Sequence, residues 1–145
     1  MRVYLDTSAL IKRYITEDGS QDIDKIFISA ADSKDLIIIS YWNIGEAATV
    51  FDKFSRKSKS QQGTKLMNIM LDEFQELARL QMINIVEVNQ NYLKEAIRFV
   101  FKYHIYVSDA IQISTAKVEM ADLFVSGDKI LIKAASEEGM KTFLV

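Results

Sequence analysis

The feature that most constrains the fold is the alternation of short apolar segments with longer amphipathic ones. The segment Leu36-Ile37-Ile38-Ile39 carries no polar residue, so both of its faces must be covered. A strand that is buried on both faces is typical of a parallel sheet. Period and residue type predict further strands at Arg2–Leu5, Ile83–Val86, Leu123–Val125 and Thr142–Leu144.

Between these strands, apolar residues recur at helical spacing. After Ser20, for example, they fall at Ile23, Phe27 and Ala30. The first helix runs from Asp6-Thr7-Ser8 to about Tyr14, with Thr7 or Ser8 as its cap. The other predicted helices are one that begins at Ser20, Trp42–Arg56, Thr64–Leu80, Asn91–Tyr103, Val107–Met120 and Lys129–Glu138, the last ending near Gly139.

Strands that alternate with helices require right-handed crossovers and a sheet that helices cover on both faces. We therefore predict an α/β fold, a three-layer α/β/α sandwich with a mostly parallel sheet. A length of 145 residues suits one domain, and no linker or repeat divides residues 1–145.

Composition limits the chemistry that is open to this chain. It has no cysteine and one histidine, His104, which excludes disulfides, thiolate metal sites and multi-histidine zinc centres. Any metal must be held by oxygen ligands, which favours Mg²⁺ or Mn²⁺. No apolar run approaches the roughly 20 residues that span a bilayer, so we expect a cytoplasmic protein. The net charge of -2 does not decide for or against nucleic acid.

Four acidic residues stand where a functional site is expected. Asp6 and Asp128 follow predicted strands directly, and ligands of open parallel sheets bind beyond the carboxyl ends of the strands. Either of these two residues, taken alone, is better explained as a helix cap or a solvated turn. Glu46 and Asp109 instead align with the apolar residues of their helices, in the first turn, where the helix dipole also stabilises a carboxylate.

No lysine or arginine is placed by the pattern to neutralise these acids. Carboxylates gathered in one cleft repel one another unless a divalent cation is bound. The chemistry that matches such a set is attack of a metal-activated water on a phosphodiester.

The chain resembles the PIN-domain family, and within it the small VapC-type toxin ribonucleases. The resemblance spans essentially the whole chain and is carried by four segments in order: Val3-Tyr4-Leu5-Asp6-Thr7-Ser8-Ala9-Leu10, Glu46, Ser108-Asp109-Ala110-Ile111-Gln112-Ile113-Ser114-Thr115-Ala116, and Ser126-Gly127-Asp128-Lys129. It implies a Mg²⁺- or Mn²⁺-dependent endoribonuclease.

The resemblance also assigns roles. It implies that Asp6, Glu46, Asp109 and Asp128 are the catalytic, metal-binding acids. Ser126 falls where the family usually has threonine, and its hydroxyl would help to hold Asp6 or a water. Gln112 stands where many members have histidine. A homodimer and a cognate antitoxin protein are implied as well.

Other features carry weaker expectations. The basic residues Lys53, Arg56, Lys57, Lys59 and Lys65 either guide an RNA backbone or form a solvated surface, and the same holds for Lys12 and Arg13. We expect Tyr41 and Trp42 to pack in the core, with stacking on a base as the alternative. His104 is expected in a loop or on the surface, without a catalytic role.

Three alternatives fit these residues less well than a nuclease does. A phosphatase of the haloacid-dehalogenase type would need a second aspartate where the chain has Ser8. A receiver-type signalling domain would need an aspartate where Ser40 or Glu87 follows a strand. A degenerate PIN-like module that only binds RNA or protein has usually lost an acid, whereas all four are present here.

Overall fold

The computed structural model describes all residues, 1–145, and contains five parallel strands in the order β3-β2-β1-β4-β5. The strands are β1 (Arg2–Leu5), β2 (Leu36–Ser40), β3 (Ile83–Val86), β4 (Leu123–Ser126) and β5 (Thr142–Leu144). The helices are α1 (Thr7–Leu10), α2 (Ser20–Ala31), α3 (Tyr41–Lys57), α4 (Gln62–Arg79), α5 (Gln90–Tyr103), α6 (Val107–Val118) and α7 (Lys129–Glu137).

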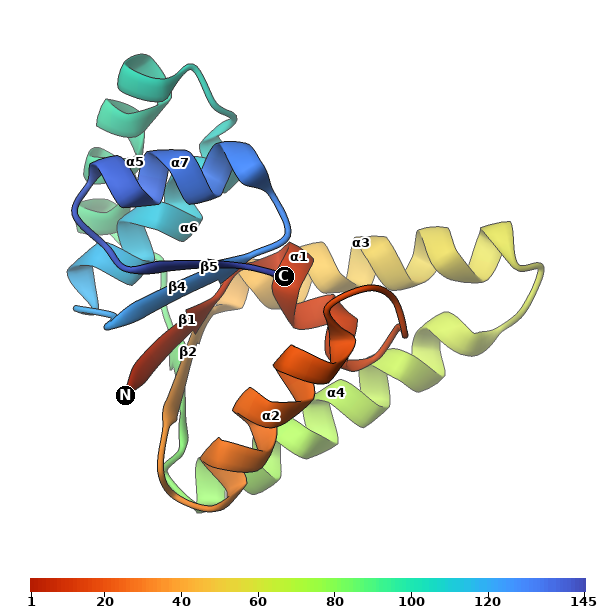
Figure 1. The fold of residues 1–145 in the computed structure, drawn as a ribbon. Helices are drawn as coiled ribbons and strands as arrows, with labels where there is room; N and C mark the ends of the chain where they lie inside the picture. The colour runs from red at the N-terminus through yellow and green to blue at the C-terminus, as the bar shows by residue number, and fades with distance from the viewer.

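Alternate residues of each central strand face opposite sides of the sheet, as the two-residue period requires. Ile37 and Ile39 belong to a core with α1, α2, α3 and α4, whereas Ile38 belongs to a second core with α5, α6 and α7. Figure 1 shows these two groups of helices on opposite sides of the strands. The predicted three-layer α/β/α sandwich is confirmed.

The helix boundaries agree closely with the predicted ones, except at the first helix. There the α-helix stops at Leu10 and continues as a short 3-10 turn over Ile11–Arg13. Its cap is Asp6, whose side chain accepts a hydrogen bond from the Ala9 backbone, so the expectation of Thr7 or Ser8 as the cap was wrong. No helix combines the length and the hydropathy that a membrane crossing requires.

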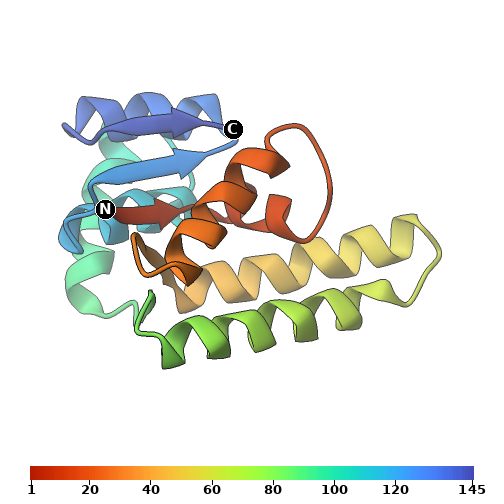
Figure 2. The same cartoon turned by 60° about the horizontal axis from the view of Figure 1, so that its bottom comes forward.

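Helices α3 and α4 form a long antiparallel hairpin that extends well past the carboxyl edge of the sheet (Figures 1 and 2). The amino-terminal turns of α3 therefore lie at that edge, while its last turns lie at the tip of the hairpin. One helix thus connects the edge of the sheet with an outlying, exposed surface.

Candidate active site

The four predicted acids, which come from four separate segments of the chain, line one pocket of about 380 Å³. Asp6 follows β1 and Asp128 follows β4, so the parallel pairing of β1 with β4 brings both to the same edge of the sheet. Asp109 lies in the first turn of α6, as predicted, but Glu46 lies in the second turn of α3, because that helix begins at Tyr41. The expectation that these side chains meet at one edge therefore agrees with the geometry.

Asp6 is the most buried of the four acids, with 4% of its surface exposed. Its Oδ1 accepts from the Ala9 backbone at 2.8 Å, and its Oδ2 accepts from the hydroxyl of Ser126 at 2.8 Å. Ser8 donates to the same carboxylate. Burial, the largest effect, and the charge of Glu46 together raise the pKa of Asp6 to about 6, although these hydrogen bonds act to lower it.

Ser126 is fully buried and joins two of the acids. Its hydroxyl donates to Asp6 and accepts from the backbone N–H of Asp128 at 2.9 Å. The placement agrees with the expectation that this serine holds Asp6. Ser126 is therefore a positioning residue, because its hydroxyl donates to one protein group and accepts from another.

Glu46 is oriented by two side chains from other elements. Gln112 of α6 donates from Nε2 to Oε2 of Glu46 at 2.6 Å, and the Thr7 hydroxyl donates to the same oxygen. The other end of Gln112 accepts from Tyr4 and from Asn43, at 2.7 and 2.8 Å. This buried network fixes the orientation of the Gln112 amide and, through it, the position of the Glu46 carboxylate.

Asp109 and Asp128 complete the pocket from the side of α6 and α7. Asp128 caps α7 through Oδ1, which accepts from the Ile130 backbone at 2.7 Å. Partial burial raises the pKa of Asp109, and the nearby charges of Asp128 and Glu46 raise it further. The raised pKa values indicate that the acids repel one another and that no nearby cation of the protein offsets their charge.

A divalent cation fits this donor set by its chemistry. No salt bridge in the molecule involves any of the four acids, so a positive charge is missing from the pocket. The protein leaves Oε1 of Glu46, Oδ2 of Asp128 and both oxygens of Asp109 without a hydrogen-bond donor. Oxygen donors of this kind suit Mg²⁺ or Mn²⁺. The carboxylates do not, as they stand, converge in a group of three on one point.

The basic residues that the sequence singled out as candidate RNA contacts divide into two groups. Lys12 and Arg13 are occupied by the protein itself, because Lys12 bonds to the Asp18 carbonyl and Arg13 pairs with Asp24 and Glu73. The second group is exposed and lies on the outer part of the α3–α4 hairpin: Lys53, Arg56, Lys57, Lys59 and Lys65. His104 is exposed at the end of α5, as expected.

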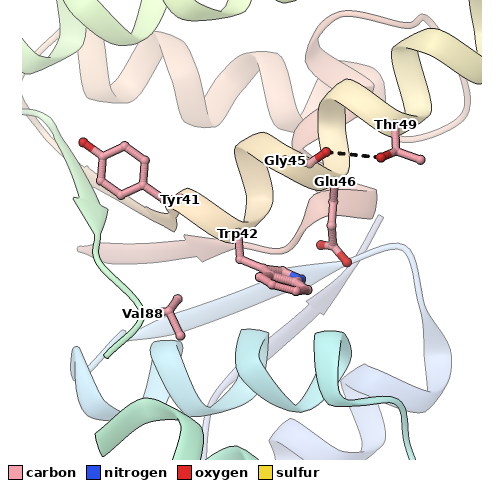
Figure 3. Close-up of a pocket in the computed structure, with 6 residues that line it drawn as sticks. All are labelled: Tyr41, Trp42, Gly45, Glu46, Thr49 and Val88. Carbon is pink, nitrogen blue, oxygen red and sulfur yellow. Dashed lines mark hydrogen bonds between the residues drawn. The ribbon is translucent and has the colours of Figure 1, made fainter. Parts of the chain in front are cut away.

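Tyr41 and Trp42 do not pack in the core, which corrects the expectation from the sequence. They are 57% and 43% exposed and line a second pocket of about 500 Å³, together with Gly45, Glu46, Thr49 and Val88 (Figure 3). Glu46 and Thr49 line both pockets. The reason for the error is that the buried face of α3 is the one that carries Asn43, Ala47 and Phe51, and Tyr41 and Trp42 lie off that face.

The residues that sequence reasoning missed are those that support the acids. The sequence suggests Thr7 and Ser8 only as caps, and Gln112 only as a residue that replaces a histidine. Gln112 is 2% exposed and bonds to Glu46. A polar residue amid the apolar run of α6 is the signal that could have identified it, since a buried amide needs partners.

Comparison with known proteins matches the PIN domain model to residues 3–137 of the chain. No curated protein matches it. Among solved structures, PAE2754 from Pyrobaculum aerophilum superposes with a TM-score of 0.68 at 17% identity, over 98% of this chain and 89% of that one.

Two further solved structures resemble the chain in fold. VapBC2 from Rickettsia felis, bound to a DNA fragment from its promoter, gives a TM-score of 0.64 at 17% identity, over 99% of this chain and 98% of that one. VapC20 from Mycobacterium tuberculosis, described as a sarcin-ricin loop cleaving toxin, gives 0.66 at 14% identity over 95% of each chain. Because the PIN domain model covers residues 3–137, the chain belongs to the PIN-domain family, whose members are generally nucleases.

Proposed function

We propose that the protein is a metal-dependent endoribonuclease and the toxin of a VapBC-type toxin–antitoxin pair. The observation that carries the proposal is the pocket in which Asp6, Glu46, Asp109 and Asp128 meet without any basic partner. These four carboxylates are the groups that would hold Mg²⁺ or Mn²⁺. A bound cation would neutralise them, lower the pKa of a water and stabilise charge on the phosphodiester oxygens.

The chain's own residues supply orientation. Ser126, Ser8 and the Ala9 backbone hold the Asp6 carboxylate in one position, and Gln112 and Thr7 do the same for Glu46. These bonds restrict the orientation of the Asp6 and Glu46 carboxylates, so little reorganisation of these two groups is needed when substrate arrives.

RNA as the substrate is supported by two exposed lysines on the face of α3 that carries Glu46. Residues 46, 50, 53 and 57 follow the helical repeat, so Lys53 and Lys57 continue the line that starts at Glu46 and Val50 in the acid pocket. Both lysines are exposed and can contact phosphates beyond the cleaved bond. The sarcin-ricin loop cleaving activity ascribed to VapC20 agrees with this choice of substrate.

The test is incubation of the purified chain with structured and single-stranded RNA, with Mn²⁺, with Mg²⁺ and with EDTA. We expect internal cleavage in the presence of either metal and none with EDTA. Asp109→Asn, which removes an acid that accepts no protein hydrogen bond, is the matched inactive variant. If wild type and Asp109→Asn bind RNA equally and neither cleaves it, the chain is a binding module and the proposal is wrong.

The partners follow from the same proposal. An antitoxin is supported by neighbours such as the toxin–antitoxin complex from Klebsiella pneumoniae. A homodimer is supported by an exposed apolar stripe on α5, where Leu93, Ile97 and Phe101 recur one turn apart and are 42%, 47% and 77% exposed. Phe101→Glu should convert a dimer into a monomer in analytical ultracentrifugation, and an unchanged mass would exclude this face.

A further inference from the structure

A second pocket opens beside the acid pocket at the start of α3. Trp42, Gly45, Glu46 and Thr49 lie at positions i, i+3, i+4 and i+7, so they share one face of the helix. Figure 3 shows the Trp42 indole on the same side of α3 as the Glu46 carboxylate, with Val88 beyond it. Glu46 and Thr49 line both pockets, so the two pockets adjoin at these residues.

The lining of this second pocket is chiefly aromatic and apolar. Trp42 and Tyr41 offer exposed rings, and Val88 adds an aliphatic surface. The Thr49 hydroxyl donates to the Gly45 carbonyl at 3.3 Å (Figure 3). Glu46 is the one carboxylate in the lining. A volume of about 500 Å³ lies within the range of small-ligand sites, roughly 300–1,000 Å³.

Gly45 gives a second, independent observation. A glycine inside a helix costs about 0.5–1 kcal/mol relative to alanine. Here no packing requires it, because a Cβ at Gly45 would meet nothing within 4 Å. Its visible effect is to leave the wall of the pocket bare between Trp42 and Thr49. Local choices that cost stability without a packing reason are typical of functional sites.

We propose that this pocket binds one unpaired nucleobase of the RNA, stacked on Trp42, while the adjoining phosphate lies at the four acids. The inference rests on the proposed function and adds to it the residue that holds a base beside the cut. A flat aromatic surface accepts a base through stacking, and duplex RNA buries its bases where no side chain can stack on them.

The first test uses binding and needs no cleavage. Trp42 is the only tryptophan in the chain, so its fluorescence reports on this pocket alone. An adenine-containing single-stranded hexanucleotide, titrated in EDTA, should quench the emission. The same hexanucleotide with abasic sugars throughout should leave it unchanged. Equal quenching by both would overturn the proposal.

The second test uses cleavage of an RNA that the wild-type chain is found to cut. An abasic nucleotide is placed in turn at each position beside the cut, and one position should lower kcat/KM by roughly 5- to 100-fold. Trp42→Ala should cause a similar loss on the intact RNA. The two losses should not multiply when combined, because both remove the same contact.

Two further variants separate loss of stacking from loss of folding. Gly45→Leu places a side chain in the pocket and favours the helix, so it should weaken cleavage while thermal stability is kept or raised. Trp42→Phe should lose less activity than Trp42→Ala. Ile28→Ala, at a 58% exposed apolar position on α2, is the control and should change nothing.

The outcomes distinguish the two proposals. If wild type cleaves RNA but the abasic penalty persists in Trp42→Ala, the base is held elsewhere and the nuclease assignment stands alone. If Trp42→Ala cleaves normally and instead weakens binding of a protein partner, the pocket holds a peptide side chain and the base subsite is wrong. If wild type cleaves no RNA, the quenching experiment alone decides whether a base binds.

Discussion

Asp6→Asn should make the metal-free protein more stable while abolishing cleavage. Asp6 has no basic partner, and burial raises its pKa to about 6 from an ordinary value of 3.8. A carboxyl group whose pKa is raised on folding favours the folded state below the unfolded pKa and loses that advantage as pH rises through the folded pKa. Ionised Asp6 therefore destabilises the protein progressively between about pH 4 and pH 6.

The size of the effect follows from the two pKa values. A difference of about 2 units corresponds to about 3 kcal/mol, which is an upper limit. Asparagine keeps the shape but weakens the bonds from Ala9 and Ser126, because an amide oxygen accepts less strongly than a carboxylate. We expect a net gain of about 1–2 kcal/mol at pH 7.5, equivalent to roughly 3–6 °C in Tm for a domain of this size.

The assay is thermal unfolding by circular dichroism between pH 4 and pH 8 in EDTA, for wild type, Asp6→Asn and Asp52→Asn. Asp52 is exposed on α3 and pairs with Arg56, so its replacement should change little at any pH. The gain of Asp6→Asn should be present at pH 7.5 and absent at pH 4. Added Mn²⁺ should then stabilise wild type more than the variant. Equal Tm values for wild type and Asp6→Asn throughout, in EDTA, would refute the argument that an unpaired charge is buried here.

Three further predictions address other groups. Gln112→Leu removes the donor to Glu46, and it should lower cleavage or the apparent Mn²⁺ affinity by roughly 10- to 100-fold; unchanged kinetics would mean that Glu46 needs no positioning. Replacing Lys53 and Lys57 by alanine should reduce the slope of log affinity against log salt for single-stranded RNA by roughly 1.4, measured by fluorescence anisotropy, and an unaltered slope would exclude them as phosphate contacts. Although burial raises the pKa of Glu138, hydrogen bonds from Lys102, Lys117 and Tyr103 lower it to about 2. Glu138→Gln should therefore cost about 1–2 kcal/mol at pH 7 in urea unfolding, allowing for the half-exposed Lys102, and the difference should shrink as pH falls from 4.5 toward 2.

The fold could be predicted because its pattern is local and repeated. The run Ile37-Ile38-Ile39 alternates between two cores, and both cores are covered because every connection between strands includes a helix. The positions of Asp6 and Asp128 could be predicted for the same reason, because parallel strands bring their carboxyl ends to one edge of the sheet.

The residues that support the acids were harder to predict from the sequence, because their roles depend on neighbours that are distant along the chain. Nothing near Gln112 indicates that its amide meets Glu46, 66 residues away, and Thr7 as well. The same holds for Trp42, whose helix position suits either a core or a surface. Its exposure depends on which face of α3 packs against the rest of the fold, which is the face of Asn43, Ala47 and Phe51.

The buried hydrogen bonds around Gln112 have a mechanical consequence. Asn43 comes from α3 on one side of the sheet, Gln112 comes from α6 on the other, and Tyr4 lies in the strand between them. The two walls of the cleft are thus tied to each other through the interior, and neither wall is a movable loop. Opening the cleft would break the buried hydrogen bonds of Gln112 with Tyr4 and Asn43. Backbone amide hydrogens at the base of the cleft should therefore exchange with solvent as slowly as those of the central strands.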